Sequence, residues 1–181
     1  MSETAVVTGA TGGIGQAVVG TLAANGYRVY AIGRAQDKLA AVQSADVVAC
    51  TADLSRLESL PDPLADLDHV HALVHCAGVE VATLADTPRA VWDETFAVIV
   101  SGPASLTRAL LPALRNAHGR IVFINAAPGL RAVPEWSAYT ASNGGSAGAG
   151  GLAPRGGAPT RSARHDDLSG RRPNGALAQG Q

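Results

Sequence analysis

A glycine-rich turn near the N-terminus is the feature that most constrains the fold of this chain. An apolar run, Thr4–Thr8, and a segment with helical spacing, Ile14–Ala24, are joined by the octet Thr8-Gly9-Ala10-Thr11-Gly12-Gly13-Ile14-Gly15. Glycines let the backbone turn tightly and approach a pyrophosphate, while free amides at the helix N-terminus face its negative charge. In this strand–turn–helix context the octet predicts a phosphate-binding loop, and a purely structural turn is the alternative.

Apolar runs and helical patterns alternate from residue 4 to residue 142. The sequence predicts strands over Thr4–Thr8, Tyr27–Ile32, Asp46–Cys50, Val70–His75 and Arg120–Asn125. It predicts helices over Ile14–Ala24 (ending at Asn25-Gly26), Asp37–Val42 and Trp92–Asn116, and a broken helix over Ser55–Leu67, which contains Pro61 and Pro63. Strands that are apolar throughout and alternate with helices imply an α/β fold, a doubly wound parallel sheet covered on both faces.

The octet resembles the TGxxxGxG signature of the short-chain dehydrogenases/reductases, and the resemblance continues to Tyr139. Asp53-Leu54 stands at the family's adenine contact, and His75-Cys76-Ala77-Gly78 resembles its NNAG turn with both asparagines replaced. Trp92 to Leu114 resembles its long interface helix, and Pro134 to Tyr139 resembles the approach to its catalytic tyrosine. The resemblance implies a Rossmann-type domain with these cofactor contacts: Gly9, Thr11, Gly12, Gly13, Ile14, Gly15, Arg34, Asp53, Leu54, Ala77 and Gly78.

The end of the second predicted strand bears on the choice of cofactor. An acidic side chain there would bind a ribose 2′-hydroxyl, but the chain has Gly33-Arg34. An arginine suits a 2′-phosphate, because its planar guanidinium binds phosphate oxygens with two hydrogen bonds. The sequence therefore favours NADP(H) over NAD, and a solvated loop arginine is the alternative.

The resemblance also implies four catalytic positions. In the family a tyrosine exchanges the proton, a lysine four residues later lowers its pKa, a serine thirteen positions earlier orients the substrate oxygen, and an asparagine holds a water relay. A free tyrosine titrates near ~10 and needs a nearby cation to act at neutral pH. Here Tyr139 is present, but Asn143, Ala126 and Ile99 occupy the other three positions.

Hydride transfer between NADP(H) and a carbonyl or alcohol is therefore expected to be impaired in this chain. Ser137 is a possible substitute hydroxyl, but we expect it on a different side of the helix start from Tyr139. A structural role for Tyr139 is the alternative to a catalytic one. A non-catalytic NADP(H)-binding protein and a nonfunctional product of a damaged reading frame are the alternatives to an impaired oxidoreductase.

The composition changes after residue 142. Residues 143–181 are dominated by Gly, Ala, Arg, Pro and Ser, show no helical or strand period, and contain no aromatic residue. Such a segment buries too little surface to offset its ordering entropy. The sequence thus predicts an incomplete NADP(H)-binding domain over residues 1–142, with the last strands missing, and a disordered tail over 143–181.

A reading-frame error is a sharper explanation of the tail. Removing the third base of codon 143 creates a lysine codon, because the next codon begins with G. In that frame Gly144 to Gly157 can encode Ala-Ala-Leu-Arg-Glu-Leu-Ala-Asp-Ser-Leu-Arg-Glu-Glu-Glu, and Arg164 to Gly170 can encode Val-Thr-Thr-Ile-Tyr-Pro-Gly, which resembles the family's sixth strand and Pro-Gly turn. We therefore expect out-of-frame translation over 143–181, with an exposed apolar edge at Ile121–Ile124 and, without the family's second interface helix, impaired homo-oligomers.

Composition excludes other classes of function. The net charge of −1 gives no electrostatic case for nucleic acid or an anionic membrane as partner. The N-terminus lacks a signal peptide pattern, no apolar run is expected to span a membrane, and no metal site is predicted. Cys50 and Cys76 end apolar runs and are expected as buried thiols rather than a disulfide. We expect a cytoplasmic protein with a small-molecule carbonyl or alcohol substrate.

Overall fold

The fold is built around a parallel β-sheet. The computed structural model describes residues 2–79, 86–126 and 135–149. Within them five strands pair in the order β3-β2-β1-β4-β5, and every pair is parallel. The strands are β1 (Thr4–Thr8), β2 (Arg28–Gly33), β3 (Val47–Thr51), β4 (Ala72–His75) and β5 (Arg120–Phe123). The predicted doubly wound parallel sheet is confirmed.

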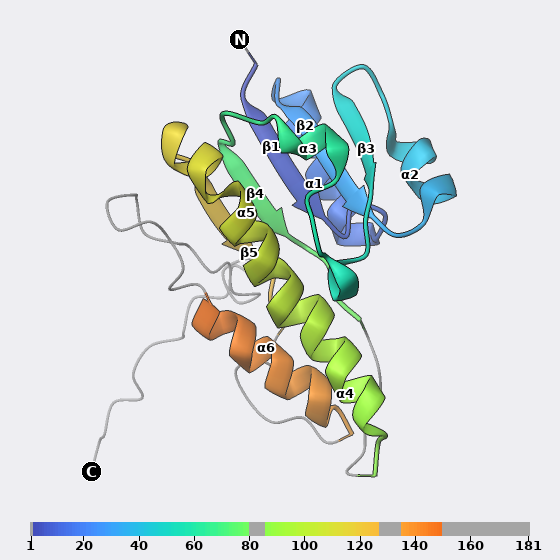
Figure 1. The fold of residues 1–181 in the computed structure, drawn as a ribbon. Helices are drawn as coiled ribbons and strands as arrows, with labels where there is room; N and C mark the ends of the chain where they lie inside the picture. Colours follow the sequence, from blue (N-terminus) through green and yellow to red (C-terminus); the bar gives the residue numbers. More distant parts are fainter. Residues whose placement is uncertain (1, 80–85, 127–134, 150–181) are drawn as a thin grey trace, which may run out of the picture.

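Helices follow the strands in alternation, as Figure 1 shows. They are α1 (Gly13–Ala24), α2 (Gln36–Val42), the 3₁₀ turn η1 (Leu54–Arg56), α3 (Asp62–Ala65), α4 (Arg89–Phe96), the π-helical turn η2 (Ala97–Ser101), α5 (Gly102–Asn116) and α6 (Ser137–Ala149). The predicted stop of α1 is confirmed, since Gly26 has φ +84° and its N–H donates to the carbonyl of Ala23 at 3.0 Å. The predicted break between Ser55 and Leu67 is confirmed as η1 followed by α3.

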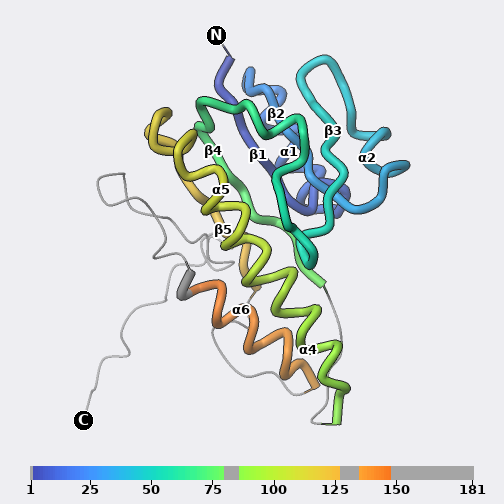
Figure 2. Tube along the Cα trace, in the orientation of Figure 1, coloured from blue at the N-terminus to red at the C-terminus, as the bar shows by residue number. Residues whose placement is uncertain are grey.

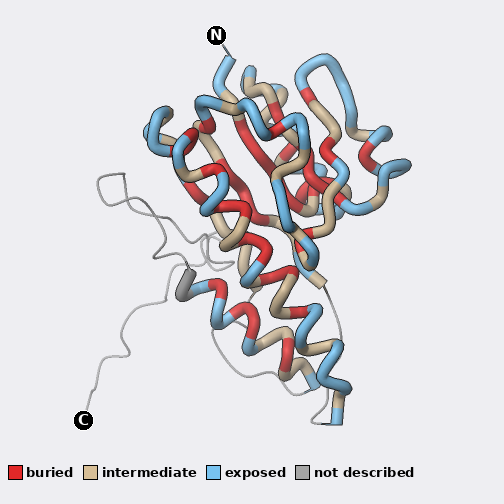
Figure 3. Tube along the Cα trace, in the orientation of Figure 1, coloured by how far each residue is buried: buried red, intermediate tan, exposed pale blue. Residues whose placement is uncertain are grey.

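Alternation along the strands divides the core into two layers. In β1, Val6 faces one side with Leu106, Leu110 and Leu114 of α5, whereas Val7 faces the other side with helices α1 and α2. Figure 3 shows the buried residues concentrated along the strands and the inner faces of the helices. Because both faces are covered, the strands need apolar residues at consecutive positions, which is the pattern in the sequence.

The long helical pattern ending at Asn116 is not one regular α-helix. It begins at Arg89 rather than Trp92, and the π-helical turn η2 interrupts it. A π turn adds one residue without changing the apolar pattern enough to be visible in a sequence, and such turns are frequent at functional sites. Ile99 lies within η2 and is buried.

Helix α6 corrects the predicted domain boundary at residue 142. It continues through Asn143 to Ala149, so the predicted disorder from 143 onward is wrong for residues 143–149. Ser142, Asn143 and Ser146 are buried, and α6 packs beside α4 and η2 (Figure 2). Packing against these elements outweighs the low helix propensity of glycine, which is a weak determinant when tertiary contacts exist. The helix after Tyr139 is therefore present, which removes the premise of the predicted defect in oligomers. Residues 150–181 and Pro134 lie outside the described residues.

Strand β5 is the edge of the sheet within the described residues, but its apolar side chains are not exposed. Ile121 is buried against α5, while Val122, Phe123 and Ile124 are half-buried. The edge position of β5 therefore agrees with the prediction within the described residues, whereas its apolar side chains are more covered than an exposed edge would imply.

One helical stretch corrects the expectation that no apolar run is long enough to span a membrane. The helical residues Arg89–Asn116 are long and apolar enough to cross a membrane by length and composition alone, and half of their most apolar window is buried in the fold. Leu106, Leu110 and Leu114 from this stretch form part of the core against the sheet. The length and apolar composition of this stretch are therefore also those expected of a core helix that covers one face of a sheet.

Candidate functional site

The candidate site lies where the strand order of the sheet reverses. β1 pairs with β2 on one side and β4 on the other, so the loops after β1 and β4 diverge from a common edge. In open α/β sheets this crevice at the carboxyl ends of the strands is the usual ligand site. The hydroxyl of Thr8 joins the two loops, because its Oγ1 accepts hydrogen bonds from the amides of Cys76 and Ala77, each at 3.2 Å.

Two glycines of the octet are required by close packing. Gly9 has φ +63°, and a Cβ there would lie 2.7 Å from the Cα of Ala77. A Cβ on Gly15 would collide with the carbonyl oxygen of Gly9. Gly13, in contrast, has open space around it. Because these two positions carry no side chain, the backbone of the octet lies close to the loop after β4, and the start of α1 lies close to the octet.

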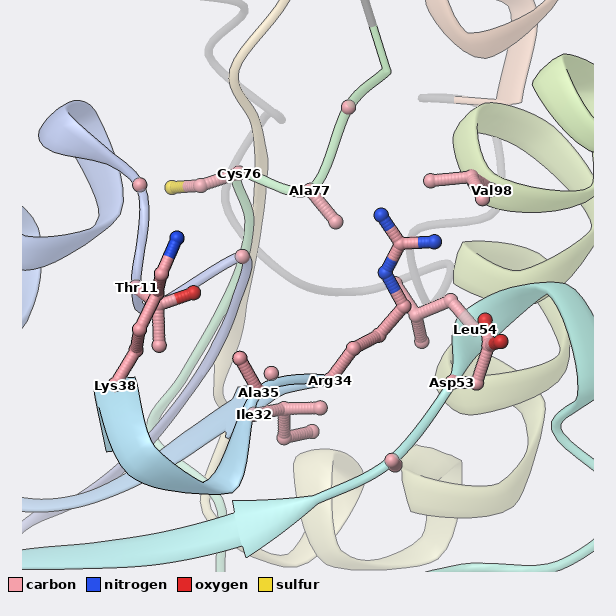
Figure 4. A pocket seen from close by; sticks show the side chains of 15 residues that line it. Thr11, Ile32, Arg34, Ala35, Lys38, Asp53, Leu54, Cys76, Ala77 and Val98 are labelled. Atoms are coloured by element: carbon pink, nitrogen blue, oxygen red, sulfur yellow. The ribbon is translucent and has the colours of Figure 1, made fainter. Parts of the chain in front are cut away.

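The larger of two adjacent pockets extends from the octet to the end of β2, with a volume of about 290 Å³ (Figure 4). Eight of the predicted cofactor contacts line it: Gly9, Thr11, Gly12, Arg34, Asp53, Leu54, Ala77 and Gly78. Ile14 instead lines the neighbouring pocket, and Gly13 and Gly15 line neither of the two. Gly15 supports the loop from beneath, as its contact with Gly9 shows.

Lys38 is a pocket residue that sequence reasoning missed. It lies in α2, four residues after Arg34, which itself follows β2, and both residues line the pocket (Figure 4). Arg34 precedes α2, so no helical spacing links the two cations, and no local pattern marked Lys38 as a pocket residue. Val98 of η2 and Cys76 were also missed as lining residues.

Arg34 is the charged centre of this pocket. Its guanidinium Nη1 lies 3.7 Å from Oε1 of Glu94 in α4, and both side chains are 58% exposed. Burial alone would raise the pKa of Asp53, but hydrogen bonds from Ser55 and the charges of Arg34 and Arg56 outweigh this and lower the pKa. Asp53 is thus a carboxylate at neutral pH, and Arg34 stands between two acidic side chains.

The smaller pocket, with a volume of about 130 Å³, brings all four catalytic positions together. Tyr139, Asn143, Ala126 and Ile99 line it, although they come from α6, the end of β5 and η2. Ser137 is not among its lining residues, which agrees with the expectation that this hydroxyl is misplaced. The pocket also borders Cys76, Ala77 and Gly78, so the two pockets share one wall.

Asn143 is held by hydrogen bonds within this pocket. Its Nδ2 donates to the carbonyl of Tyr139 at 2.8 Å, and its Oδ1 accepts from the amide of Ala126 at 3.4 Å. Asn125, which sequence reasoning missed, donates from Nδ2 to the carbonyl of Asn143 at 2.9 Å and to Oγ of Ser146 at 3.3 Å. Asn125 therefore fastens the end of β5 to α6, which carries Tyr139.

His75 is a buried neutral side chain at the back of the smaller pocket. Burial lowers its pKa to about 3. Its Nε2 is 3.0 Å from the hydroxyl of Thr107, and its ring stacks on Phe123 at 4.7 Å between centroids. Its Nδ1 is buried and has no hydrogen-bond partner among the described residues. Burial raises the pKa of Cys50 and of Cys76 to about 11, so both thiols stay protonated. Both are free, but only Cys50 is fully buried as predicted, whereas Cys76 is half-buried.

Taken together, the sheet, the glycine-rich loop at its switch point and the cationic pocket define a Rossmann-type dinucleotide-binding protein. No cluster of metal-ligating side chains occurs in the described parts of the chain. The family model for short chain dehydrogenases matches residues 3–149. The chain therefore belongs to the short chain dehydrogenase family.

Known proteins similar to this chain agree with the family. It is 33% identical over 156 residues to the D-beta-hydroxybutyrate dehydrogenase of Rhizobium meliloti, covering 78% of this chain and 60% of that protein. It is 35% identical over 153 residues to the NADPH-dependent 1-acyldihydroxyacetone phosphate reductase of Saccharomyces cerevisiae, covering 76% of this chain and 50% of that protein. A short chain dehydrogenase of Shigella flexneri solved in complex with NADP is 27% identical, with a TM-score of 0.74 and coverage of 83% of this chain and 70% of that one. The chain thus spans about 60% or less of the two enzymes it was aligned with.

Proposed function

We propose that this chain binds NADP(H) and descends from an oxidoreductase that transfers a hydride between NADP(H) and a small carbonyl or alcohol substrate. The observation that carries the proposal is the pair of pockets that share the Cys76–Gly78 wall. One holds the cations Arg34 and Lys38, and the other holds Tyr139. Relatives whose names specify NADPH or a complex with NADP support the choice of cofactor.

The residues of the larger pocket fit a dinucleotide phosphate. Gly12, the residue before α1, has no side-chain bond to the helix start, so the first-turn amides are available for a pyrophosphate. Arg34 and Lys38 suit a 2′-phosphate, and Asp53-Leu54 would border the adenine. Ile14 is 62% exposed and lines the smaller pocket, where it offers an apolar surface to a nicotinamide ring. Bound NADP(H) supplies or accepts the hydride.

The chain's own residues have little of the acid–base chemistry that such a reaction requires. Tyr139 would give or take the proton of the substrate oxygen. Asn143 carries no charge to lower the pKa of a phenol that ordinarily titrates near ~10. Ala126 has no hydroxyl to orient the substrate oxygen, and Ile99 cannot hold a water relay. Loss of a positioned acid–base group typically costs about 10²–10⁴ in rate, so we propose that catalysis is impaired.

A non-catalytic NADP(H)-binding protein is the second candidate function. It is favoured by one observation: the Asn143 amide hydrogen-bonds to the backbone of Tyr139 and of Ala126. A neutral side chain used in this way holds the local backbone and supplies no charge beside Tyr139. Turnover of any carbonyl or alcohol above the background of a Tyr139→Phe variant would exclude this second function.

Calorimetric titration of the purified full chain with NADPH and NADH tests the proposal directly. We expect NADPH to bind more tightly than NADH, and Arg34→Ala to remove the difference, because it removes a guanidinium that pairs with the 2′-phosphate. Arg56→Ala is the matched control, since Arg56 is a cation close to Asp53 but does not line the larger pocket. Failure of both nucleotides to bind would refute the proposal.

We further propose that the protein acts on a small molecule in the cytoplasm. The absence of a positive net charge supports the exclusion of nucleic acid as partner. We also propose that the reading frame changes after codon 142. In the present frame, α6 extends to Ala149.

A further inference from the structure

The contact between Arg34, which lines the larger pocket, and Glu94 joins two elements that are distant in the sequence. Arg34 follows β2, whereas Glu94 belongs to α4, and the Nη1–Oε1 distance is 3.7 Å. Glu94 does not itself line the larger pocket. In Figure 4 the Arg34 guanidinium extends toward Val98 of η2, the turn that follows α4.

Without a bound phosphate, Arg34 interacts with two acidic side chains, Asp53 and Glu94. The charge of Arg34 contributes to lowering the pKa of Asp53, after the larger effects of burial, which raises it, and the Ser55 hydrogen bonds. Glu94 is the second acidic partner. A 2′-phosphate would need the same guanidinium N–H groups that face Glu94, so the phosphate and the Glu94 carboxylate compete for Arg34.

Lys38 differs from Arg34 in this respect. It lines the same pocket, and it forms no ion pair with any residue in the described part of the chain. Its ammonium is therefore available to a phosphate without displacing a carboxylate. The pocket thus contains one cation that is shared with an acid and one that is not.

From this arrangement we propose that Glu94 is a specificity-determining residue, which lowers the affinity of the pocket for a 2′-phosphate by competing for Arg34. The inference rests on the proposed NADP(H) function. Neutralising Glu94 is expected to strengthen binding of a 2′-phosphorylated adenosine and to leave binding of the unphosphorylated form unchanged. Exposed ion pairs are weak, so the expected gain is about two- to fivefold in affinity.

The test compares 2′,5′-ADP with 5′-AMP, which differ only in the 2′-phosphate, by calorimetric titration of the full chain. Glu94→Gln is expected to tighten 2′,5′-ADP by about two- to fivefold, with the gain shrinking at high ionic strength. Asp93→Asn is the matched control. It removes the same charge from the neighbouring position of α4, but Asp93 pairs with Arg89 at 3.2 Å rather than with Arg34.

A double-mutant cycle with Arg34→Ala locates the effect. The gain from Glu94→Gln should vanish in the Arg34→Ala background and persist in Lys38→Met, because Glu94 contacts only the first of these cations. An equal gain for 5′-AMP, an equal gain from Asp93→Asn, or a gain that survives Arg34→Ala would overturn the proposal. If the unmodified chain binds neither nucleotide, the proposed function fails as well. Binding of 2′,5′-ADP with no response to Glu94→Gln refutes the Glu94 proposal alone.

Discussion

Gly15 packs directly beneath the carbonyl of Gly9, so the shape of the phosphate loop depends on the absence of one methyl group. We expect Gly15→Ala to abolish NADPH binding and to destabilise the fold by about 1–3 kcal/mol, the usual cost of overpacking. Gly20→Ala in the same helix is the control, because its Cβ would meet nothing within 4 Å and alanine favours helix by up to about 1 kcal/mol. Calorimetry and denaturant unfolding measure both quantities. Undiminished NADPH binding by Gly15→Ala would contradict this account of the loop.

The buried His75 is expected to make the free energy of unfolding depend on pH. Its pKa is lowered from 6.5 to about 3 by burial, so between these values the unfolded chain binds a proton that the folded chain does not. The free energy of unfolding should therefore decrease as the pH falls below about 6.5, by at most about 1.4 kcal/mol per pH unit from this group. The contribution is fully present above that pH, and its loss is complete only below the folded-state pKa.

Urea unfolding at a series of pH values measures this slope. His75→Asn should make the curve between these pH values flatter, because asparagine does not titrate. His118→Asn is the control: His118 is exposed, and asparagine tolerates its φ of 50°. Identical pH dependence in the original chain and in His75→Asn would show that the histidine is not buried as a neutral ring.

Replacing Asn143 and Ala126 tests whether the missing cation and hydroxyl limit catalysis. Asn143→Lys combined with Ala126→Ser would place a cation and a hydroxyl in the pocket that contains Tyr139. We expect this double variant to consume NADPH about 10²–10⁴ times faster than the original chain on a panel of ketones and aldehydes, since the cation lowers the pKa of the phenol. The control is Asn143→Met with Ala126→Ser, which has similar length without the charge. An equal rate from the control would mean that the charge is not what the site lacks.

At the scale of single elements, α6 is built from residues that seldom form a helix. Gly144, Gly145 and Gly148 lie in its second half, and each lowers the stability of a helix by up to about 1 kcal/mol relative to alanine. A Cβ on Gly145 would meet only Val100 Cγ2 at 3.5 Å, an ordinary contact. Gly145→Ala should therefore raise the free energy of unfolding by about 0.5–1 kcal/mol. Gly26→Ala, at φ +84°, should lower it instead, and equal effects of the two changes would argue against the helix.

Elements with a strong local signal were predictable from the sequence, and elements held by tertiary packing were not. The apolar strands and the octet could be located, because burial on both faces and a tight turn each restrict the residue type locally. The extension of α6 to Ala149 could not be predicted, since its residues have low propensity and are held by α4 and η2. The π turn at Ala97–Ser101 also leaves no periodic trace.

The candidate site shows the same division. Arg34, Asp53 and Tyr139 were found through spacing from the octet or from a family motif. Lys38, Asn125 and Glu94 were not, because their roles depend on contacts between elements distant in sequence, such as the bonds from Asn125 to Asn143 and Ser146. Two of the three are nevertheless close in sequence to predicted site residues, since Lys38 is four residues after Arg34 and Asn125 precedes Ala126.

At the scale of the whole molecule, α6 bears on the reading frame. Ser146 is buried and Ala147 is exposed in the helix. In the shifted frame, position 146 can encode leucine and position 147 arginine, which would give the buried position the apolar residue and the exposed one the charge. The same frame would place lysine at position 143, which lines the pocket that contains Tyr139. The lysine at position 143 follows from the shifted frame alone, and the environments of positions 146 and 147 are compatible with residues that this frame can encode. We therefore propose a base insertion at codon 143.

Sequencing the source DNA across codons 136 to 175, with mass spectrometry of the native protein, tests this prediction. We expect one base fewer near codon 143, and peptides in which the lysine is followed by a helical pattern with leucine. Such a protein would have the cation that Tyr139 needs, and its activity should match that of the Asn143→Lys variant more closely than that of the chain described here. Peptides that continue from Asn143 through the Gly-rich residues to Gln181 would establish the present frame as the one the cell uses. Loss of the catalytic cation would then be a property of the native protein, and NADPH binding without turnover its expected behaviour.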